Sequence, residues 1–162
     1  MFRVYTNLSP VTFLEGVVER GFGRGSKSLG FPTANLNSNS SASVKEFLNS
    51  PSCQDGIYVG WASIEGFEGI FNAAISVGLN PTFEDSKVRL LEAHLIDFSG
   101  PNFYGRRLRL ILCAFIRPTL KFESIESLKE EIWNDCEFSR EWLEKDQSSK
   151  ALEGSSFLTW NS

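Results

Sequence analysis

The 162-residue sequence is poor in residues that bind metals or form cross-links. It has one histidine, His94, and three cysteines, Cys53, Cys113 and Cys136. The cysteines are far apart and form no CxxC pair, which indicates a reducing compartment rather than a disulfide framework. A single histidine with three scattered cysteines also argues against a structural zinc site.

Long apolar runs are also missing. No segment approaches the roughly 20 apolar residues that a membrane helix needs, so we expect no membrane partner. The first five residues lack the charged region, apolar stretch and small-residue cleavage site of a signal peptide. We therefore expect a cytoplasmic protein.

Basic residues are in the minority. The 16 lysines and arginines against 20 aspartates and glutamates give a formal net charge of −4 at pH 7. General nucleic-acid binders depend on neutralising phosphates, so this balance argues against a nucleic-acid partner, although a local basic pocket could still hold a small anion. The 41% hydrophobic and 22% charged content is ordinary for a globular chain, and the length favours one domain over residues 1–162.

Segments rich in β-branched and aromatic residues dominate the chain up to about residue 117. We expect strands over residues 11–20, 57–64, 70–77, 88–96 and 107–117. In the third of these, alternate residues from Phe71 to Val77 are apolar and share one face. No helix-length segment separates these strands, which favours an antiparallel sheet or barrel over parallel βαβ units.

The 107–117 strand has a simple alternating pattern. Its even positions, from Leu108 to Ile116, are apolar, and we expect them all on one face. Arg107, Arg109 and Arg117 fall on the other face, where we expect solvated charges at an edge.

Helix is predicted only near the C-terminus. Ser124 can cap a helix whose apolar residues Ile125, Leu128, Ile132 and Cys136 follow a spacing near 3.6. Residues 140–143 either continue this helix or begin a second one. The serine-rich segment of about 37–52 is predicted to be a flexible surface loop. Apolar residues in the tail of about 148–162, including Phe157 and Trp160, indicate that the tail docks on the domain.

The most unusual segment is glycine-rich and basic. Gly21, Gly23 and Gly25 precede Lys27 directly after a predicted strand. Closely spaced glycines let backbone N–H groups approach an anion, and a lysine adds positive charge. The segment matches neither the P-loop GxxxxGK[ST] nor the dinucleotide pattern GxGxxG. A glycine-rich turn without ligand is the alternative.

Polar residues follow this segment at strand spacing. Pro32 favours an extended chain, which places the side chains of Thr33 and Asn35 on the same side. A hydroxyl and an amide oxygen beside an anion cradle could hold Mg²⁺ that is already bridged to phosphates. The alternative is that both residues satisfy backbone groups of a turn.

Glu92 and His94 interrupt a predicted strand. Glutamate is depleted in strands and costly to bury unpaired, but a carboxylate in an apolar face can serve as a general base. The alternatives are that both residues face solvent or pair with each other. For His94, we favour a structural hydrogen bond over a metal or catalytic role.

In combination, these motifs resemble the riboflavin kinase, or flavokinase, family. The segments that carry the resemblance, in the family's order, are Gly21–Leu36, Asp55–Tyr58, Ser76–Phe83, Leu91–Leu95, Asp97–Phe98, Phe103–Gly105, Phe115–Pro118 and Lys121–Ser124. The resemblance covers about residues 11–142. Its most specific part is the Pro-Thr-Ala-Asn sequence that follows the glycine loop.

The resemblance implies a mainly β fold, a six-stranded antiparallel Greek-key β-barrel, here with C-terminal α-helices packed on it. It implies transfer of the γ-phosphoryl group of ATP to the 5′-hydroxyl of riboflavin, giving FMN and ADP. The implied ATP-binding residues are Gly21, Gly23, Gly25, Lys27, Thr33 and Asn35.

The resemblance also implies the chemical roles of individual residues. Thr33 and Asn35 would hold Mg²⁺ or another divalent ion such as Zn²⁺, and Glu92 would take the proton from the attacking hydroxyl. The loop around Arg117 and Phe122 would close over the flavin.

Three further expectations concern the whole chain. With 162 residues and no second nucleotide-binding segment, the chain resembles the stand-alone kinase typical of eukaryotes, and we expect a monomer. Segments 37–52 and 148–162 match no family motif. The runner-up function is a non-catalytic flavin- or nucleotide-binding β-barrel; an oligonucleotide-binding barrel is disfavoured by the acidic balance.

Overall fold

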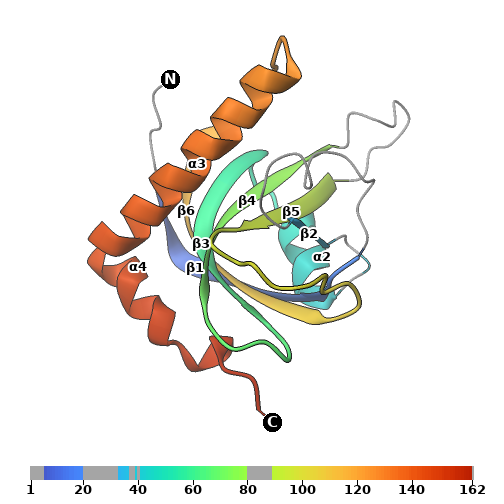
Figure 1. Ribbon diagram of the computed structural model, residues 1–162, viewed down its shortest axis with the longest axis vertical. Helices are drawn as coiled ribbons and strands as arrows, with labels where there is room; N and C mark the ends of the chain where they lie inside the picture. The colour runs from blue at the N-terminus through green and yellow to red at the C-terminus, as the bar shows by residue number, and fades with distance from the viewer. Residues whose placement is uncertain (1–5, 20–32, 37–38, 40, 80–88, 162) are drawn as a thin grey trace.

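The computed structural model describes residues 6–19, 33–36, 39, 41–79 and 89–161 (Figure 1). The strands are β1 (Thr6–Val17), β2 (Thr33–Leu36), β3 (Gly56–Ile64), β4 (Phe71–Leu79), β5 (Arg89–Leu95) and β6 (Arg107–Pro118). The helices are α2 (Ala42–Asn49), α3 (Ile125–Lys145) and α4 (Gln147–Ala151), followed by the short 3₁₀ turns η1 (Leu152–Gly154) and η2 (Ser156–Leu158).

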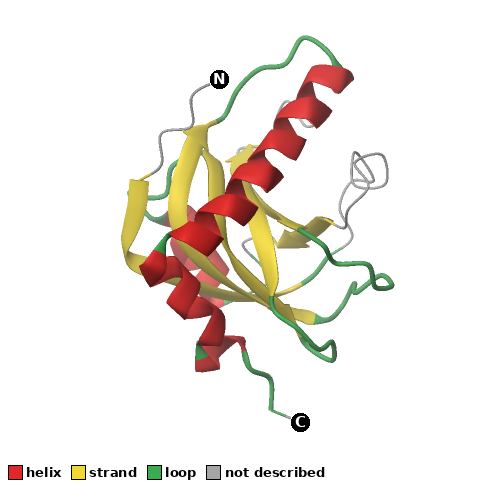
Figure 2. Cartoon of the chain, turned by 60° about the vertical axis from the view of Figure 1, so that its left-hand side comes forward, coloured by secondary structure: helices red, strands yellow, loops and turns green. Residues whose placement is uncertain are grey.

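The strands form one antiparallel sheet in the order β1-β6-β3-β4-β5-β2. Strands β3, β4 and β5 follow one another, and β6 returns to lie beside β3, which is a Greek-key arrangement. The sheet curls so that Glu19, just after β1, makes an isolated bridge with Asn35 of β2 (Figures 1 and 2). The expected mainly β, six-stranded, barrel-like fold is confirmed.

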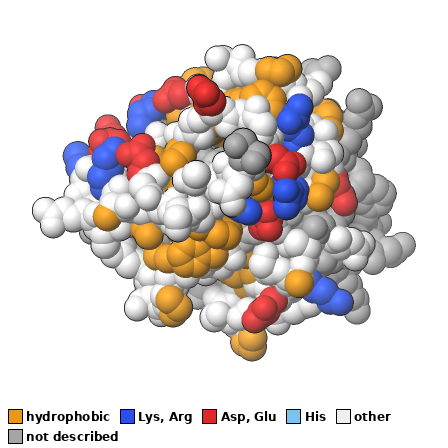
Figure 3. Space-filling model, turned by 90° about the horizontal axis from the view of Figure 1, so that it is seen from below, with side chains coloured by type: hydrophobic (Ala, Val, Ile, Leu, Met, Phe, Trp, Pro, Cys, Tyr) orange, Lys and Arg blue, Asp and Glu red, His pale blue; other side chains and the backbone are white. Residues whose placement is uncertain are grey.

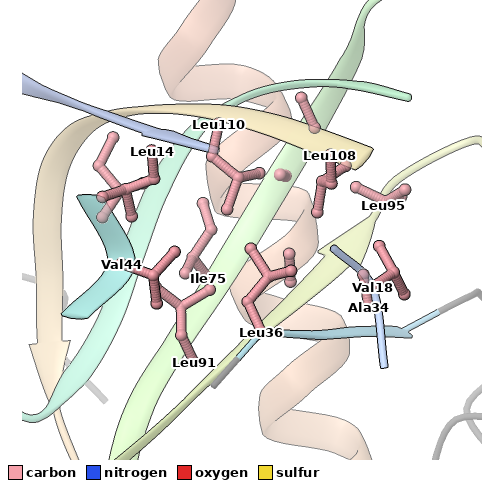
Figure 4. Close-up of a cluster of buried hydrophobic side chains, with 14 of the residues drawn as sticks. Leu14, Val18, Ala34, Leu36, Val44, Ile75, Leu91, Leu95, Leu108 and Leu110 are labelled. Atoms are coloured by element: carbon pink, nitrogen blue, oxygen red, sulfur yellow. The ribbon is translucent and has the colours of Figure 1, made fainter. Parts of the chain in front are cut away.

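The inside of the curled sheet is an apolar core. Alternating residues of every strand point inward, as the pattern from Phe71 to Val77 predicted for β4. Leucine and isoleucine side chains from β1, β2, β4, β5 and β6 meet in the centre (Figure 4). Burying each such side chain contributes about 1.5–3 kcal/mol, so this core is a main source of stability.

Helix α2 corrects the expectation of a flexible loop over 37–52. Ser41 caps the helix by accepting a hydrogen bond from the Val44 backbone N–H, and Val44 and Leu48, one turn apart, reach the inner core. The Arg89 guanidinium donates to the Leu48 carbonyl at 2.7 Å, near the other end of the helix. The serine content suggested a loop, but serine is also a preferred N-cap residue. Burial of Val44 and Leu48 on one face stabilises the helical conformation.

Strand β6 departs from the expected alternation. Leu108, Leu110 and Leu112 face the inner core as predicted, but Ala114 and Ile116 belong to the outer apolar layer. The reason is a pair of register shifts against β3, one of which lies between the residues paired with Leu112 and Ala114. Each such bulge adds a residue to one strand and changes the face of those that follow.

The outer layer packs beneath α3, which runs diagonally across the outside of the sheet (Figures 1 and 2). The predicted cap is confirmed, since Ser124 Oγ accepts from the Ser127 N–H at 3.1 Å, and the helix continues through residues 140–143. The predicted apolar stripe is wrong at its start. Ile125 and Leu128 are 67% and 39% exposed because the first turns of α3 extend past the sheet.

A buried ion pair joins β6 to α3. Arg117 donates to both carboxylate oxygens of Asp135, at 2.8 and 2.7 Å, and the two side chains are only 4% and 2% exposed. The expectation of a solvated charge is therefore wrong for Arg117. Because Arg117 lies beneath α3, its side chain is buried and pairs with Asp135 of that helix.

The C-terminal tail docks as expected. The Trp61 indole donates to the Ser149 carbonyl at 2.7 Å, and the Trp160 indole donates to Ser63 Oγ at 3.1 Å. The Arg109 guanidinium lies 3.9 Å from the centre of the Trp160 ring, a cation–π contact. The tail therefore covers part of the outer face of β3 and β6.

The surface mixes charges of both signs. In the view from below, blue and red side chains lie next to one another around a hydrophobic patch (Figure 3). Arg107 pairs with Glu65, and Arg109 pairs with Glu15. Among the helices of the described residues, none is long and apolar enough to span a membrane.

The buried ion pair generates a prediction about stability. Asp135→Asn keeps the shape of the side chain but leaves the Arg117 charge uncompensated, so we expect a loss of about 3–5 kcal/mol in the free energy of unfolding. The matched control is Asp97→Asn, which breaks the exposed pair with Arg140 and should cost less than about 1 kcal/mol. Urea denaturation of both variants measures the difference. Equal losses would show that the Arg117–Asp135 pair does not anchor α3.

Candidate active site

The pairing of β2 with β5 brings the predicted site residues together. Thr33 lies opposite His94, and Asn35 lies opposite Glu92. These four side chains share the outer face of the sheet because their neighbours point into the inner core, namely Ala34, Leu36, Leu91, Ala93 and Leu95. Residues some 60 positions apart in the sequence thus form one polar cluster.

Strand β4 extends this cluster by one residue. Ser76 lies opposite Glu92 on the other side of β5, so Asn35, Glu92 and Ser76 form a row across three strands. Directly opposite side chains in an antiparallel sheet have Cβ atoms about 4.5–5.5 Å apart. Ser76 was not singled out as a site residue from the sequence, since its register against β5 is not a local property.

Glu92 sits at the centre of the row and is half-buried. Burial raises the pKa of Glu92 to about 7, because removal from water disfavours the charged carboxylate. A carboxylate whose pKa lies near the working pH is well matched to accepting a proton.

His94 is buried and links two of the predicted residues. Its Nδ1 lies 3.2 Å from Thr33 Oγ1, and its Nε2 lies 3.7 Å from Glu92 Oε1. Burial lowers the pKa of His94 to about 4, so the ring is neutral at physiological pH. The expected structural hydrogen bond is confirmed, but its partner Thr33 was not foreseen.

The residues present suit a hard divalent cation better than a soft one. Thr33 and Asn35 offer oxygen atoms on one face, beside the Glu92 carboxylate. Mg²⁺ prefers oxygen ligands and needs few from the protein when phosphates supply the rest. The described part of the chain contains no cluster of three or more His, Cys, Asp or Glu side chains that could hold a metal ion by themselves.

A cavity of about 450 Å³ lies between the segment after β6 and the first turns of α3. It is lined by Leu120, Lys121, Phe122, Ser127, Glu130, Glu131 and Asn134. The segment before it also approaches β4, since a Cβ placed on Gly78 would lie 3.9 Å from Thr119 Oγ1. Gly78 is two residues from Ser76, so the cavity and the polar row lie near the same end of β4.

The two residues predicted to contact a flavin differ in position. Phe122 lines the cavity, whereas Arg117 is buried in its pair with Asp135, with its guanidinium carbon 6.0 Å from the centre of the Phe122 ring. The predicted phosphate-binding residues Gly21, Gly23, Gly25 and Lys27 lie outside the described residues.

Comparisons with known proteins agree with this geometry. Residues 8–143 match the family described as "Flavokinase: Riboflavin kinase". The chain is 35% identical over 145 residues to the human protein named riboflavin kinase, covering 90% of this chain and 89% of the relative. It is 40% identical over 144 residues to a bifunctional riboflavin kinase/FMN phosphatase of Arabidopsis thaliana, covering 89% of this chain but only 36% of that longer protein.

A solved structure extends the likeness to the fold. The crystal structure of riboflavin kinase from Trypanosoma brucei superposes with a TM-score of 0.70 at 26% identity, covering 97% of this chain and 92% of that chain. The family match spans most of the sequence and includes every residue of the polar cluster. The chain therefore belongs to the riboflavin kinase family of enzymes.

Proposed function

We propose that the chain transfers the γ-phosphoryl group of ATP to the 5′-hydroxyl of riboflavin, yielding FMN and ADP. The observation that carries the proposal is the alignment of Thr33, Asn35 and Glu92 on the outer face of β2 and β5. Phosphoryl transfer depends on positioning and charge neutralisation more than on covalent chemistry by the protein, and this cluster supplies groups for both.

Glu92 is the proposed general base. Its carboxylate accepts the proton of the riboflavin 5′-hydroxyl as that oxygen forms a bond to the γ-phosphorus. The bond between the γ-phosphorus and its bridging oxygen breaks, and ADP leaves with the electron pair. The raised pKa of Glu92 supports the role because the carboxylate can hold the transferred proton near neutral pH.

Thr33 and Asn35 are the proposed residues that hold a divalent ion, with Mg²⁺ favoured by their oxygen atoms and Zn²⁺ as the alternative. When bound, the ion neutralises charge on the ATP phosphates. The family resemblance adds a phosphate cradle formed by Gly21, Gly23, Gly25 and Lys27.

The cavity beside α3 is the proposed flavin site. Phe122 offers an aromatic face for the isoalloxazine ring, and offset stacking of such rings is favourable. Arg117 supports the site indirectly, because its pair with Asp135 holds the Phe122 segment against α3. Both sites belong to one chain, so we propose that a monomer is active.

The test of the proposed function is a product assay. We expect the purified chain to convert riboflavin to FMN with ATP and Mg²⁺, and EDTA in excess over the metal to abolish FMN formation. Chromatographic separation of the flavins measures the product. Binding of riboflavin or ATP without FMN formation would instead establish the non-catalytic barrel.

Removal of the proposed base should slow the chemical step. We expect Glu92→Gln to lower kcat by about 10²- to 10⁴-fold, the contribution of a general acid–base group, while both substrates still bind. The matched control is Glu46→Gln, the same change at an exposed position on α2, which should retain the parent kcat. Steady-state kinetics decide, and near-parental turnover of Glu92→Gln would remove the residue from this role.

Shortening the aromatic residue of the cavity should affect one substrate. We expect Phe122→Ala to raise the KM for riboflavin by about tenfold, the loss of one aromatic stacking contact of about 1.5 kcal/mol, with the KM for ATP unchanged. Phe13→Ala serves as a control, since Phe13 is a partly exposed aromatic residue on β1. Equal changes in the two KM values would place the flavin elsewhere.

A further inference from the structure

We propose that His94 is a positioning residue for the phosphoryl transfer, holding the Thr33 hydroxyl and the Glu92 carboxylate in one hydrogen-bonded chain. The proposal rests on the proposed function and adds a residue to its machinery. Its basis is geometric: Nδ1 is 3.2 Å from Thr33 Oγ1, and Nε2 is 3.7 Å from Glu92 Oε1. One ring thus faces both a proposed cation ligand and the proposed base.

The direction of the hydrogen bonds follows from the chemistry at the Thr33 end. A neutral imidazole has one N–H donor and one acceptor nitrogen. When Thr33 Oγ1 turns its lone pairs to a cation, its proton needs an acceptor, and Nδ1 is the nitrogen within reach. The ring proton then resides on Nε2.

The Glu92 end selects the same tautomer. With the proton on Nε2, the ring presents a donor to Glu92 Oε1; with the proton on Nδ1, it would present a lone pair to a carboxylate oxygen. The separation of 3.7 Å exceeds the usual range of about 2.7–3.2 Å, so this contact is an ion-pair distance rather than a formed hydrogen bond in the free protein. Catalytic hydrogen bonds often shorten only when substrate binds.

Burial makes this arrangement rigid. His94 is only 5% exposed and is packed between β2 and β4, opposite Thr33 on one side and Ala74 on the other. A ring confined in this way cannot turn to solvent. The ring therefore holds Nδ1 against Thr33 and presents Nε2 toward Glu92 in a fixed orientation.

The first test reads the tautomer directly. His94 is the only histidine, so ¹⁵N labelling of histidine reports on this ring alone in the full chain. At pH 8 and with Mg²⁺ in excess, we expect ¹⁵N shifts of a ring protonated at Nε2 and unprotonated at Nδ1. A ring protonated at Nδ1 would overturn the proposal. The readout needs neither substrate nor turnover, so it is independent of whether the proposed function holds.

Four substitutions separate the contact with Thr33 from the contact with Glu92. His94→Phe removes both contacts, and we expect kcat to fall and the Mg²⁺ concentration for half-maximal rate to rise, each by about 10–100-fold. His94→Asn retains an acceptor for Thr33 and should restore the Mg²⁺ dependence, whereas His94→Gln retains a donor for Glu92 and should restore kcat. Thr33→Val should reproduce the Mg²⁺ defect alone.

A purely structural histidine gives a different pattern. His94→Phe would then lower thermal stability while kcat and the Mg²⁺ dependence stay at parental values, and the proposal would be overturned.

If His94 acts through Glu92, the His94→Phe change should cost little kcat in a Glu92→Gln background; a full additional loss would refute that route. Parental turnover by Glu92→Gln alone would instead refute the proposed base, and the tautomer would still decide the hydrogen-bonded chain.

Discussion

The register of β2 against β5 is the constraint on which the site depends. Thr33 and Asn35 meet His94 and Glu92 only because Ala34 and Leu36 are held in the inner core on the same short strand. A slip of one residue would turn the polar pair inward and the apolar pair outward, at the cost of burying unsatisfied polar groups. Core packing thus fixes the position of the chemistry, and the bridge from Glu19 to Asn35 ties β2 to the other edge of the sheet.

The cavity proposed for the flavin is positioned by a different kind of interaction. The cavity beside Phe122 exists because the chain turns from β6 into α3, and the Arg117–Asp135 pair fixes that turn from beneath. A buried ion pair gains little net stability compared with apolar packing, but it tolerates only one geometry. It holds α3 in a defined orientation where the first turns of the helix have little apolar support from the sheet.

One environment acts in opposite directions on two titratable groups. Burial raises the pKa of Glu92 and lowers that of His94, because it disfavours the charged form of each. Near neutral pH the His94 ring is therefore uncharged, whereas the Glu92 carboxyl is partly ionised. In the proposed mechanism, Glu92 can therefore act as a carboxylate before the transfer and hold the proton after it, while the neutral His94 ring can donate one hydrogen bond and accept another.

Local sequence patterns by themselves predicted five of the six strands, an extended segment where β2 lies, the Ser124-capped helix and the motifs that identify the family. Alternation reports which residues share a face, so Thr33 with Asn35 and the inner residues of β4 were predictable. Tertiary structure decided what no local pattern encodes: the bulges of β6, the Arg117–Asp135 pair, and helix α2 within a serine-rich segment. It also decided the contact between Thr33 and His94, which are 61 residues apart. Such contacts depend on strand register and shared burial, and these arise only when distant segments pack on one core.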